Sequence, residues 1–315
     1  MVAVFLIGAS GFVGGQVLKQ LSQDHPEFAI RALVRDAQVG KRISDLYPRV
    51  EIIVGGLDDD LVEVESSRAN IVLTYWVQIS GASLLAARDL ASPDYDVGLP
   101  SSKVYDDLEG RDEVRSLIRD HPSREIDNYL LDVGSQTPQV KTAIVFPPII
   151  YGKGDGPVHR TSIQIPSLAR VTLERGHGVR VGAGENRWGH VHVADVARIF
   201  TGLAEAAAVG RDDASLWNDD GLYLASTSDV SFAHLSNLVV KAASEKGLIK
   251  STDIQVLSKE ESANVLPGGP VFFGSNARGI ASRAKELLGW KQTEHGIEEE
   301  IPRAVAEEAS NRTGK

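Results

Sequence analysis

The stretch that decides the fold lies at the start of the chain and reads Val2-Ala3-Val4-Phe5-Leu6-Ile7-Gly8-Ala9-Ser10-Gly11-Phe12-Val13-Gly14-Gly15. Its first part, residues 2–7, is a continuous apolar run, which is typical of a strand buried on both faces. After the glycines, apolar residues such as Val13, Val17 and Leu21 recur at helical spacing. The order of strand, glycine turn and helix predicts a dinucleotide-binding unit.

The three spaced glycines of this turn have distinct expected roles. Gly8 permits a sharp turn, Gly11 lets backbone amides approach a pyrophosphate, and Gly14 lets the helix pack closely on the strand. The anion would sit at the helix N-terminus, where unpaired N–H groups favour negative charge. The alternative is a glycine-rich turn without a ligand. We assign the cofactor contacts of this region to Gly8, Ser10, Gly11, Phe12, Val13 and Gly14.

The end of the second predicted strand indicates which dinucleotide is bound. Residues 28–34 are followed by Arg35, where an NAD site would carry an acidic residue for the ribose 2′-hydroxyl. A guanidinium instead suits a 2′-phosphate, which it can hold through paired hydrogen bonds. We therefore predict NADP, and NAD remains the alternative if Asp36 binds the ribose and Arg35 is a solvated surface charge.

Composition excludes several classes of function. The 315 residues suffice for one large domain or two modest ones. A net charge of −10 without a basic run argues against nucleic acid or an anionic membrane as partner. The chain has no Cys, so disulfides, thiolate metal sites and a Cys nucleophile are excluded. With neither a membrane-length apolar run nor a leader-like start, we expect a cytoplasmic protein.

Motifs along nearly the whole chain resemble the extended short-chain dehydrogenases, the NAD-dependent epimerase/dehydratase family. Beyond the opening glycine turn, the matching segments are residues 30–36, 147–154, 189–197, 271–278 and 285–290. The resemblance implies a Rossmann-like, doubly wound parallel sheet with a smaller, mostly helical substrate domain. Residues 1–150 and 186–225 would form the dinucleotide-binding domain, residues 151–185 and 226–310 the substrate domain, and residues 311–315 a tail.

The same resemblance implies a function and a cofactor position. It implies an NADP-dependent oxidoreductase, epimerase or dehydratase acting on a small-molecule carbonyl or alcohol, with Pro147 close to the nicotinamide. Arg160, Arg170, Arg187 and Arg278 are candidates for a basic pocket if the substrate is a sugar nucleotide. Members of the family often pair through helices, so a homodimer is compatible with the resemblance.

The region around residues 69–83 departs from the family pattern. Residues 71–73 resemble the end of a fourth strand, whereas residues 75–80 resemble the fifth strand and lead into its active-site turn. A parallel crossover needs a dozen or more residues, so both stretches cannot keep their family places. We hypothesise that a crossover helix is missing, through deletion, splicing or a mistaken gene model. One long strand in a rearranged sheet is the alternative.

The catalytic residues of the family are only partly present. None of the seven Tyr residues is followed by Lys four positions later, so the Tyr-x-x-x-Lys pair is absent. Ser80 and Ser83 are the candidate hydroxyls for a substrate oxygen, with simple turn chemistry as the alternative. Tyr105 is the substitute proton donor, and a packed or surface residue is an equal alternative. A non-catalytic NADP-binding regulator or redox sensor, or an inactive truncated gene product, is therefore an alternative function.

A metal site is not expected. His190 and His192 lie two residues apart, so on a strand they face the same side, and Asp195 follows them. The sequence offers no further ligand at a convincing spacing, and the family resemblance accounts for the segment without a metal.

Overall fold

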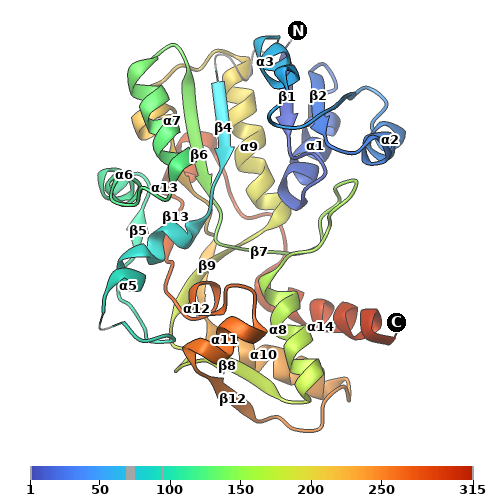
Figure 1. Ribbon diagram of the computed structural model, residues 1–315, viewed down its shortest axis with the longest axis vertical. Helices are drawn as coiled ribbons and strands as arrows, with labels where there is room; N and C mark the ends of the chain where they lie inside the picture. The colour runs from blue at the N-terminus through green and yellow to red at the C-terminus, as the bar shows by residue number, and fades with distance from the viewer. Residues whose placement is uncertain (1, 69–74, 94, 314–315) are drawn as a thin grey trace.

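Two parallel half-sheets form the upper part of the molecule in Figure 1. The structure is a computed structural model, and it describes residues 2–68, 75–93 and 95–313. The first half-sheet has the order β1-β2-β3, with β1 (Ala3–Ile7), β2 (Ala29–Val34) and β3 (Glu51–Val54). The second has the order β10-β6-β4, with β10 (Leu222–Leu224), β6 (Lys141–Phe146) and β4 (Tyr75–Ile79). Within each half-sheet all pairs are parallel, because each strand is followed by a crossover connection.

Helix α9 connects the two half-sheets. It packs along α1 and also contacts β4. Its buried residues share one hydrophobic cluster with Val4 of β1, Tyr75 of β4 and Val145 of β6. The elements that surround the half-sheets are α1 (Phe12–Asp24), α2 (Ala37–Leu46), α3 (Asp60–Ser67), η1 (Ala82–Ala86), α5 (Ala87–Ala91), α6 (Arg111–Arg119), α7 (Glu125–Gln136), α9 (Val193–Ala208), η2 (Asn218–Asp220) and α13 (Ser282–Leu288).

Smaller sheets and several helices form the lower part of the molecule in Figure 1. Strand β9 pairs in parallel with β7 and antiparallel with β11, and β8 pairs with β12. At the side, β5 (Tyr105–Asp106) pairs with β13 (Gly279–Ile280). The remaining elements are β7 (Ile149–Tyr151), α8 (Gln164–Arg175), β8 (Gly178–Val181), β9 (Arg187–His192), β11 (Ser228–Ser231), α10 (Phe232–Glu245), β12 (Ile254–Leu257), α11 (Lys259–Val265), α12 (Gly269–Phe272) and α14 (Ile297–Thr313).

The predicted α/β fold with a Rossmann-like parallel arrangement is confirmed. The end of the predicted fourth strand, residues 71–73, lies outside the described residues, as does the junction where we place the missing crossover helix. The predicted fifth strand is present as β4 and pairs with β6. Among the described residues, no strand pairing joins β1 to β4. No described helix has both the length and the apolar character needed to cross a membrane.

Residues 281–290 lie against the dinucleotide-binding part of the fold. Ala281, Ala284 and Trp290 share the hydrophobic cluster of α1 and α9, and α13 contacts β10. The predicted assignment of residues 226–310 to the substrate domain therefore includes a segment that packs on the other domain. The other domain boundaries stay predictions.

The core between α1 and the half-sheets gives a first prediction. Leu18 on α1 is fully buried in this cluster, so Leu18→Ala is expected to lower the free energy of unfolding by about 2–5 kcal/mol. Leu46→Ala on α2 is the matched control, because Leu46 is 61% exposed and its loss should cost less than about 0.5 kcal/mol. Urea unfolding followed by tryptophan fluorescence measures both. Equal losses would contradict the described core.

A histidine at the end of α1 gives a pH-dependent prediction. Burial lowers the pKa of His25, but its hydrogen bonds to Glu205 and Glu27 outweigh this effect, so the pKa lies above its ordinary value. A raised folded-state pKa stabilises the protein below the unfolded-state pKa of 6.5, and this stabilisation is lost as pH rises through the folded-state pKa.

His25→Gln should therefore cost about 0.5 kcal/mol at pH 5.5 and almost nothing at pH 9. Urea melts at the two pH values measure this difference. A cost that does not change with pH would contradict the pairing.

Candidate functional site

The glycine turn between β1 and α1 has the geometry expected of a pyrophosphate-binding loop. Gly8 has a φ of 86°, a conformation that side-chain-bearing residues rarely adopt. A Cβ on Gly14 would lie 2.2 Å from the Gly8 carbonyl oxygen, so only glycine allows this approach of helix to strand. Gly11 precedes the first turn of α1 and no side chain caps that turn. The first N–H groups of α1 are therefore available to an anion.

Residues 152–160 run across the beginning of α1. The His159 N–H donates to the Ser10 carbonyl oxygen at 3.1 Å, and the Asp155 N–H donates to Gln16 Oε1 at 2.8 Å. The Lys19 ammonium lies 2.5 Å from the Asp155 carboxylate. This segment therefore bounds one side of the glycine turn.

Glycines allow the close contact between this segment and α1. A Cβ on Gly15 would lie 3.1 Å from Gly156 Cα, and a Cβ on Gly154 would lie 3.1 Å from the Phe12 ring. Phe12 thus rests against the crossing segment, while Val13 packs partly buried against the core cluster.

The end of β2 distinguishes the two residues considered for the ribose. Asp36 caps α2, and its Oδ1 accepts the N–H groups of Gln38 and Val39 at 2.6 and 3.3 Å. Arg35 is exposed and makes no hydrogen bond or ion pair with any residue in the described part of the chain. The carboxylate is thus engaged in holding the helix, whereas the guanidinium remains available.

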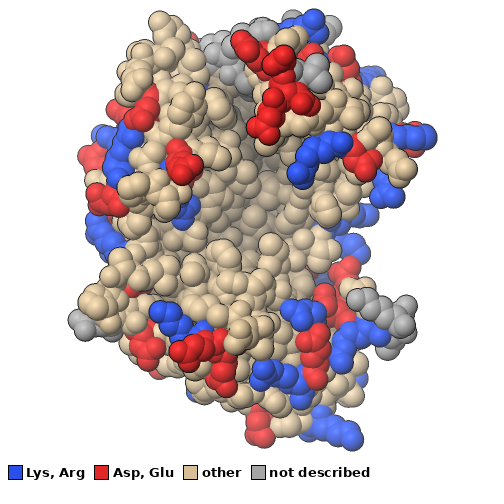
Figure 2. All heavy atoms as spheres, viewed as in Figure 1, with Lys and Arg blue, Asp and Glu red and all other residues tan. Residues whose placement is uncertain are grey.

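The carboxyl ends of β4 and β6 bring Ser80 and Pro147 together. The Ser80 N–H donates to the Val145 carbonyl at 2.8 Å, and the Ala82 N–H donates to the Pro147 carbonyl at 3.0 Å. Ligands of open α/β sheets bind at this edge, beyond the carboxyl ends of the strands. Figure 2 shows this face hollowed between the upper and lower parts, and the visible walls of the hollow are mainly uncharged.

Helix α7 supplies polar partners to the turn after β4. Ser80 Oγ donates to Asp127 Oδ2 at 2.8 Å, and Arg124 Nη2 donates to Ser83 Oγ at 2.9 Å. The Arg124 guanidinium also reaches the Gly81 carbonyl oxygen at 3.3 Å and lies 3.6 Å from the Asp127 carboxylate. Burial raises the pKa of Asp127, although the Ser80 and Arg124 contacts oppose the shift.

The structure does not join Tyr105 to this group. Its side chain is 3% exposed and lies in a hydrophobic cluster, with the Lys103 ammonium 4.8 Å from the ring centre. Burial raises the pKa of the Tyr105 hydroxyl. Among the described residues, no hydrogen bond or ion pair links Tyr105 with Ser80, so its role as proton donor stays a prediction.

The four candidate arginines occupy different places. Arg187 and Arg278 share the carboxylate of Asp229, at 2.5 and 3.0 Å. Arg160 instead binds the Gly154 carbonyl oxygen within residues 152–160, and Arg170 pairs with Glu174 along α8. Only Arg187 and Arg278 therefore form a shared basic cluster.

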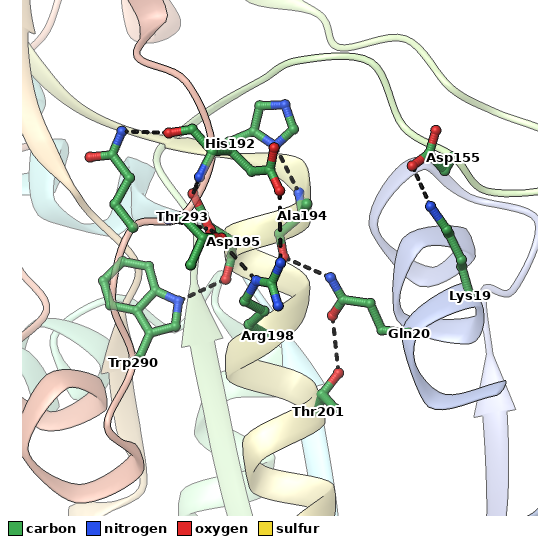
Figure 3. A network of polar contacts seen from close by, with 12 residues as sticks. Lys19, Gln20, Asp155, His192, Ala194, Asp195, Arg198, Thr201, Trp290 and Thr293 are labelled. Carbon is green, nitrogen blue, oxygen red and sulfur yellow. Dashed lines mark hydrogen bonds and ion pairs between the residues drawn. The ribbon is translucent and has the colours of Figure 1, made fainter. Parts of the chain in front are cut away.

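The beginning of α9 is fixed by the network in Figure 3. Asp195 accepts the Thr293 N–H at 3.0 Å and the Thr293 hydroxyl at 2.6 Å, and the Trp290 indole donates to the Asp195 carbonyl oxygen at 2.7 Å. Gln20 of α1 donates to the Ala194 carbonyl oxygen at 2.9 Å. Asp195 thus ties the segment after α13 to α9.

Metal-type donor atoms gather at His192, Glu294 and His295, where they lie within 4.8 Å of one another beside a cavity of about 670 Å³. His192 Nδ1 accepts the Ala194 N–H at 3.2 Å, so the proton of the neutral ring lies on Nε2. Arg303 Nη1 lies 3.4 and 3.2 Å from the two ring nitrogens of His295. Because these contacts compete with a cation, we assign no metal here.

Both ring nitrogens of His190 are also occupied by neighbouring hydroxyl groups. Its ring nitrogens contact the hydroxyls of Ser228 and Thr227 at 2.9 and 3.4 Å. Burial lowers the pKa of His190 to about 4, so the ring is neutral at pH 7.

Comparison with known proteins agrees with this architecture. The family model of the semialdehyde dehydrogenase NAD-binding domain matches residues 3–75. An oxidase of an Acremonium species, ucsJ, is 29% identical over 340 residues, with 97% of each chain covered.

Two solved structures are similar over almost the whole chain. The dTDP-glucose 4,6-dehydratase of Bacillus anthracis, in complex with NAD, has a TM-score of 0.66 and 11% identity, covering 99% of this chain and 98% of its own. The UDP-glucuronic acid 4-epimerase of Bacillus cereus, in complex with UDP-glucuronic acid and NAD, has a TM-score of 0.61 and 14% identity, covering 98% and 100%. The chain therefore has the fold of the extended short-chain dehydrogenases, and the predicted resemblance is confirmed at the level of the fold.

Sequence reasoning did not identify Arg124 and Asp127. The two residues lie three positions apart in the sequence, a spacing that places them on one face of a helix. Neither of them matches a Tyr or Lys of the family pattern. Their contact with Ser80 arises only when α7 packs beside the end of β4. His295 and Glu294 were missed for the same reason, since they lie far from His192 in sequence.

The glycine turn gives a third prediction. Gly14→Ala places a methyl group against the Gly8 carbonyl, so we expect a loss of about 1–3 kcal/mol of stability and no measurable binding of a nicotinamide dinucleotide. Gly296→Ala is the control, because nothing lies within 4 Å of its added Cβ. Thermal melts and titration of NADPH fluorescence measure the two effects. Unchanged NADPH binding by Gly14→Ala would contradict the assignment of the turn.

Proposed function

We propose that the chain is an NADP-dependent oxidoreductase that transfers hydride between the nicotinamide and a small-molecule carbonyl or alcohol. The observation that carries this proposal is the glycine turn, in which Gly8 and Gly14 pack closely and leave the first N–H groups of α1 uncapped. A pyrophosphate bound there would place the dinucleotide along the carboxyl edge of the sheet. Support also comes from the NAD complexes of the two similar structures.

The preference for NADP rests on Arg35 and Asp36. Asp36 is engaged as the cap of α2, which leaves its carboxylate poorly placed to receive a ribose hydroxyl. The exposed Arg35 guanidinium would hold a 2′-phosphate through charge-assisted hydrogen bonds.

The substrate oxygen is assigned to Ser80, beside Pro147 at the ends of β4 and β6. The cluster of Arg187, Arg278 and Asp229 carries one net positive charge, which favours an anionic group on the distant part of the substrate. An epimerase or dehydratase reaction would use the same cofactor position.

A second candidate function is a non-catalytic NADP-binding regulator. It is favoured by one observation, that α7 carries no Tyr-x-x-x-Lys pair. Hydride transfer from bound NADPH to a carbonyl compound would exclude it.

The cofactor preference gives a fourth prediction. Arg35→Ala should weaken NADPH binding by about 1.5–3 kcal/mol, which is about 10- to 150-fold, and leave NADH binding nearly unchanged. Calorimetric titration of both dinucleotides measures this. Arg312→Ala, at the exposed end of α14, is the control and should alter neither affinity. Equal affinity of the unaltered chain for NADH and NADPH would contradict the preference for NADP.

A further inference from the structure

We propose that Asp127 and Arg124 take over the proton-handling function for which the chain lacks a Tyr–Lys pair, with Ser80 carrying the proton between Asp127 and the substrate oxygen. This inference rests on the proposed oxidoreductase function and assigns its acid–base groups. Ser80 contacts the substrate, whereas Asp127 and Arg124 act through it as positioning residues.

The contacts of Ser80 carry the first step of the argument. Its backbone N–H continues the pairing of β4 with β6, which fixes the residue at the carboxyl edge of the sheet. Its hydroxyl lies 2.8 Å from Asp127 Oδ2, a distance suited to proton transfer in either direction. Among the described residues, no other carboxylate forms a hydrogen bond with Ser80.

Asp127 and Ser80 differ in their exposure to solvent. The Asp127 side chain is 5% exposed, so it is largely shielded from bulk water. Ser80 is half-buried and directly follows the carboxyl end of β4. A proton held on Asp127 thus reaches the cleft through the serine hydroxyl.

Arg124 stabilises the charge that Asp127 acquires. Its guanidinium lies 3.6 Å from Asp127 Oδ2 and 3.4 Å from Ser80 Oγ, and it is 22% exposed. Hydrogen bonds to Ser83 and to the Gly81 carbonyl hold it in this place. A fixed cation at this distance favours the carboxylate over the acid after the proton has left.

The proposed reduction transfers one hydride and one proton to the carbonyl group of the substrate. The nicotinamide of NADPH gives hydride to the carbonyl carbon, and the π electrons of the C=O bond move to its oxygen. That oxygen takes the Ser80 proton while Ser80 takes the proton of the Asp127 carboxylic acid. The products are the alcohol, NADP⁺ and the Asp127 carboxylate beside Arg124, and solvent restores the proton. Oxidation of an alcohol runs the same steps in reverse.

A purely structural network would hold the turn after β4 without moving a proton. The two roles differ in their dependence on pH. If Asp127 supplies the proton, the rate of reduction falls as pH rises through the pKa of Asp127, which burial raises above its ordinary value. A structural role would leave the pH profile unchanged when Asp127 becomes Asn.

The test compares variants of the full chain in the reduction of phenanthrenequinone and diacetyl by NADPH. Asp127→Asn should lower kcat about 10²- to 10⁴-fold, change KM only a few-fold and abolish the fall of the rate at high pH. Asp127→Glu should restore part of the rate with a pH-dependent profile. Asp132→Asn and Ser135→Ala are controls, because these residues of α7 contact Arg119 and the helix backbone, not Ser80.

Thermal melts with NADPH show separately whether each variant folds and binds the cofactor. If Asp127→Asn does not fold, Ser80→Ala, which removes the relay and leaves the carboxyl group, should show the same loss of kcat. A wild-type chain that does not bind NADPH would overturn the proposed function itself. A wild-type chain that binds NADPH without reducing either probe would overturn the oxidoreductase function together with this inference, whereas an Asp127→Asn variant with an unchanged rate and pH profile would overturn this inference alone.

Discussion

The packing of α9 against α1 and β4 is the constraint on which the rest of the structure depends. No strand pairing among the described residues joins β1 to β4, so side-chain packing, more than backbone hydrogen bonding, relates the two halves. Helix α9 is rich in Ala and Val, which lets it approach both α1 and β4 closely. The hydrophobic cluster that results fixes the glycine turn relative to Ser80. A cofactor bound at the turn and a substrate bound at Ser80 therefore depend on the same buried contacts.

Polar contacts at the beginning of α9 complement this packing. Asp195 holds the segment around Thr293, and Gln20 links α1 to the first turn of α9. Because Asp195 and Gln20 are buried, each contact that they lose would leave an unsatisfied polar atom, which costs more than a surface hydrogen bond gains. The segments that border the cofactor site thus have a fixed geometry although they are distant in sequence.

The candidate site combines a glycine turn with a polar group formed by Ser80, Asp127 and Arg124. The turn requires glycine because a Cβ on Gly14 would collide with the Gly8 carbonyl, and that requirement does not depend on the substrate. No comparable steric requirement determines which residues lie at the substrate end of the site. The hydroxyl, carboxylate and guanidinium that gather there belong to Ser80, Asp127 and Arg124. Chemistry at this place is therefore a property of this chain's own side chains, since fold alone does not define it.

The sequence by itself determined the strand, glycine turn and helix at residues 2–24 and Ser80 at a strand end, and it offered Arg35 and Asp36 as alternatives for the ribose. Each depends on neighbouring residues, because φ angles, helix periodicity and capping are local properties. Only the tertiary structure brought Asp127 and Arg124 to Ser80, Glu294 and His295 to His192, and residues 281–290 to α9. It also placed Tyr105 in a hydrophobic cluster, with no hydrogen bond to Ser80 among the described residues. These outcomes depend on which helix faces pack together. Such packing brings together residues that lie far apart in the sequence, so their spacing along the chain does not predict the contacts.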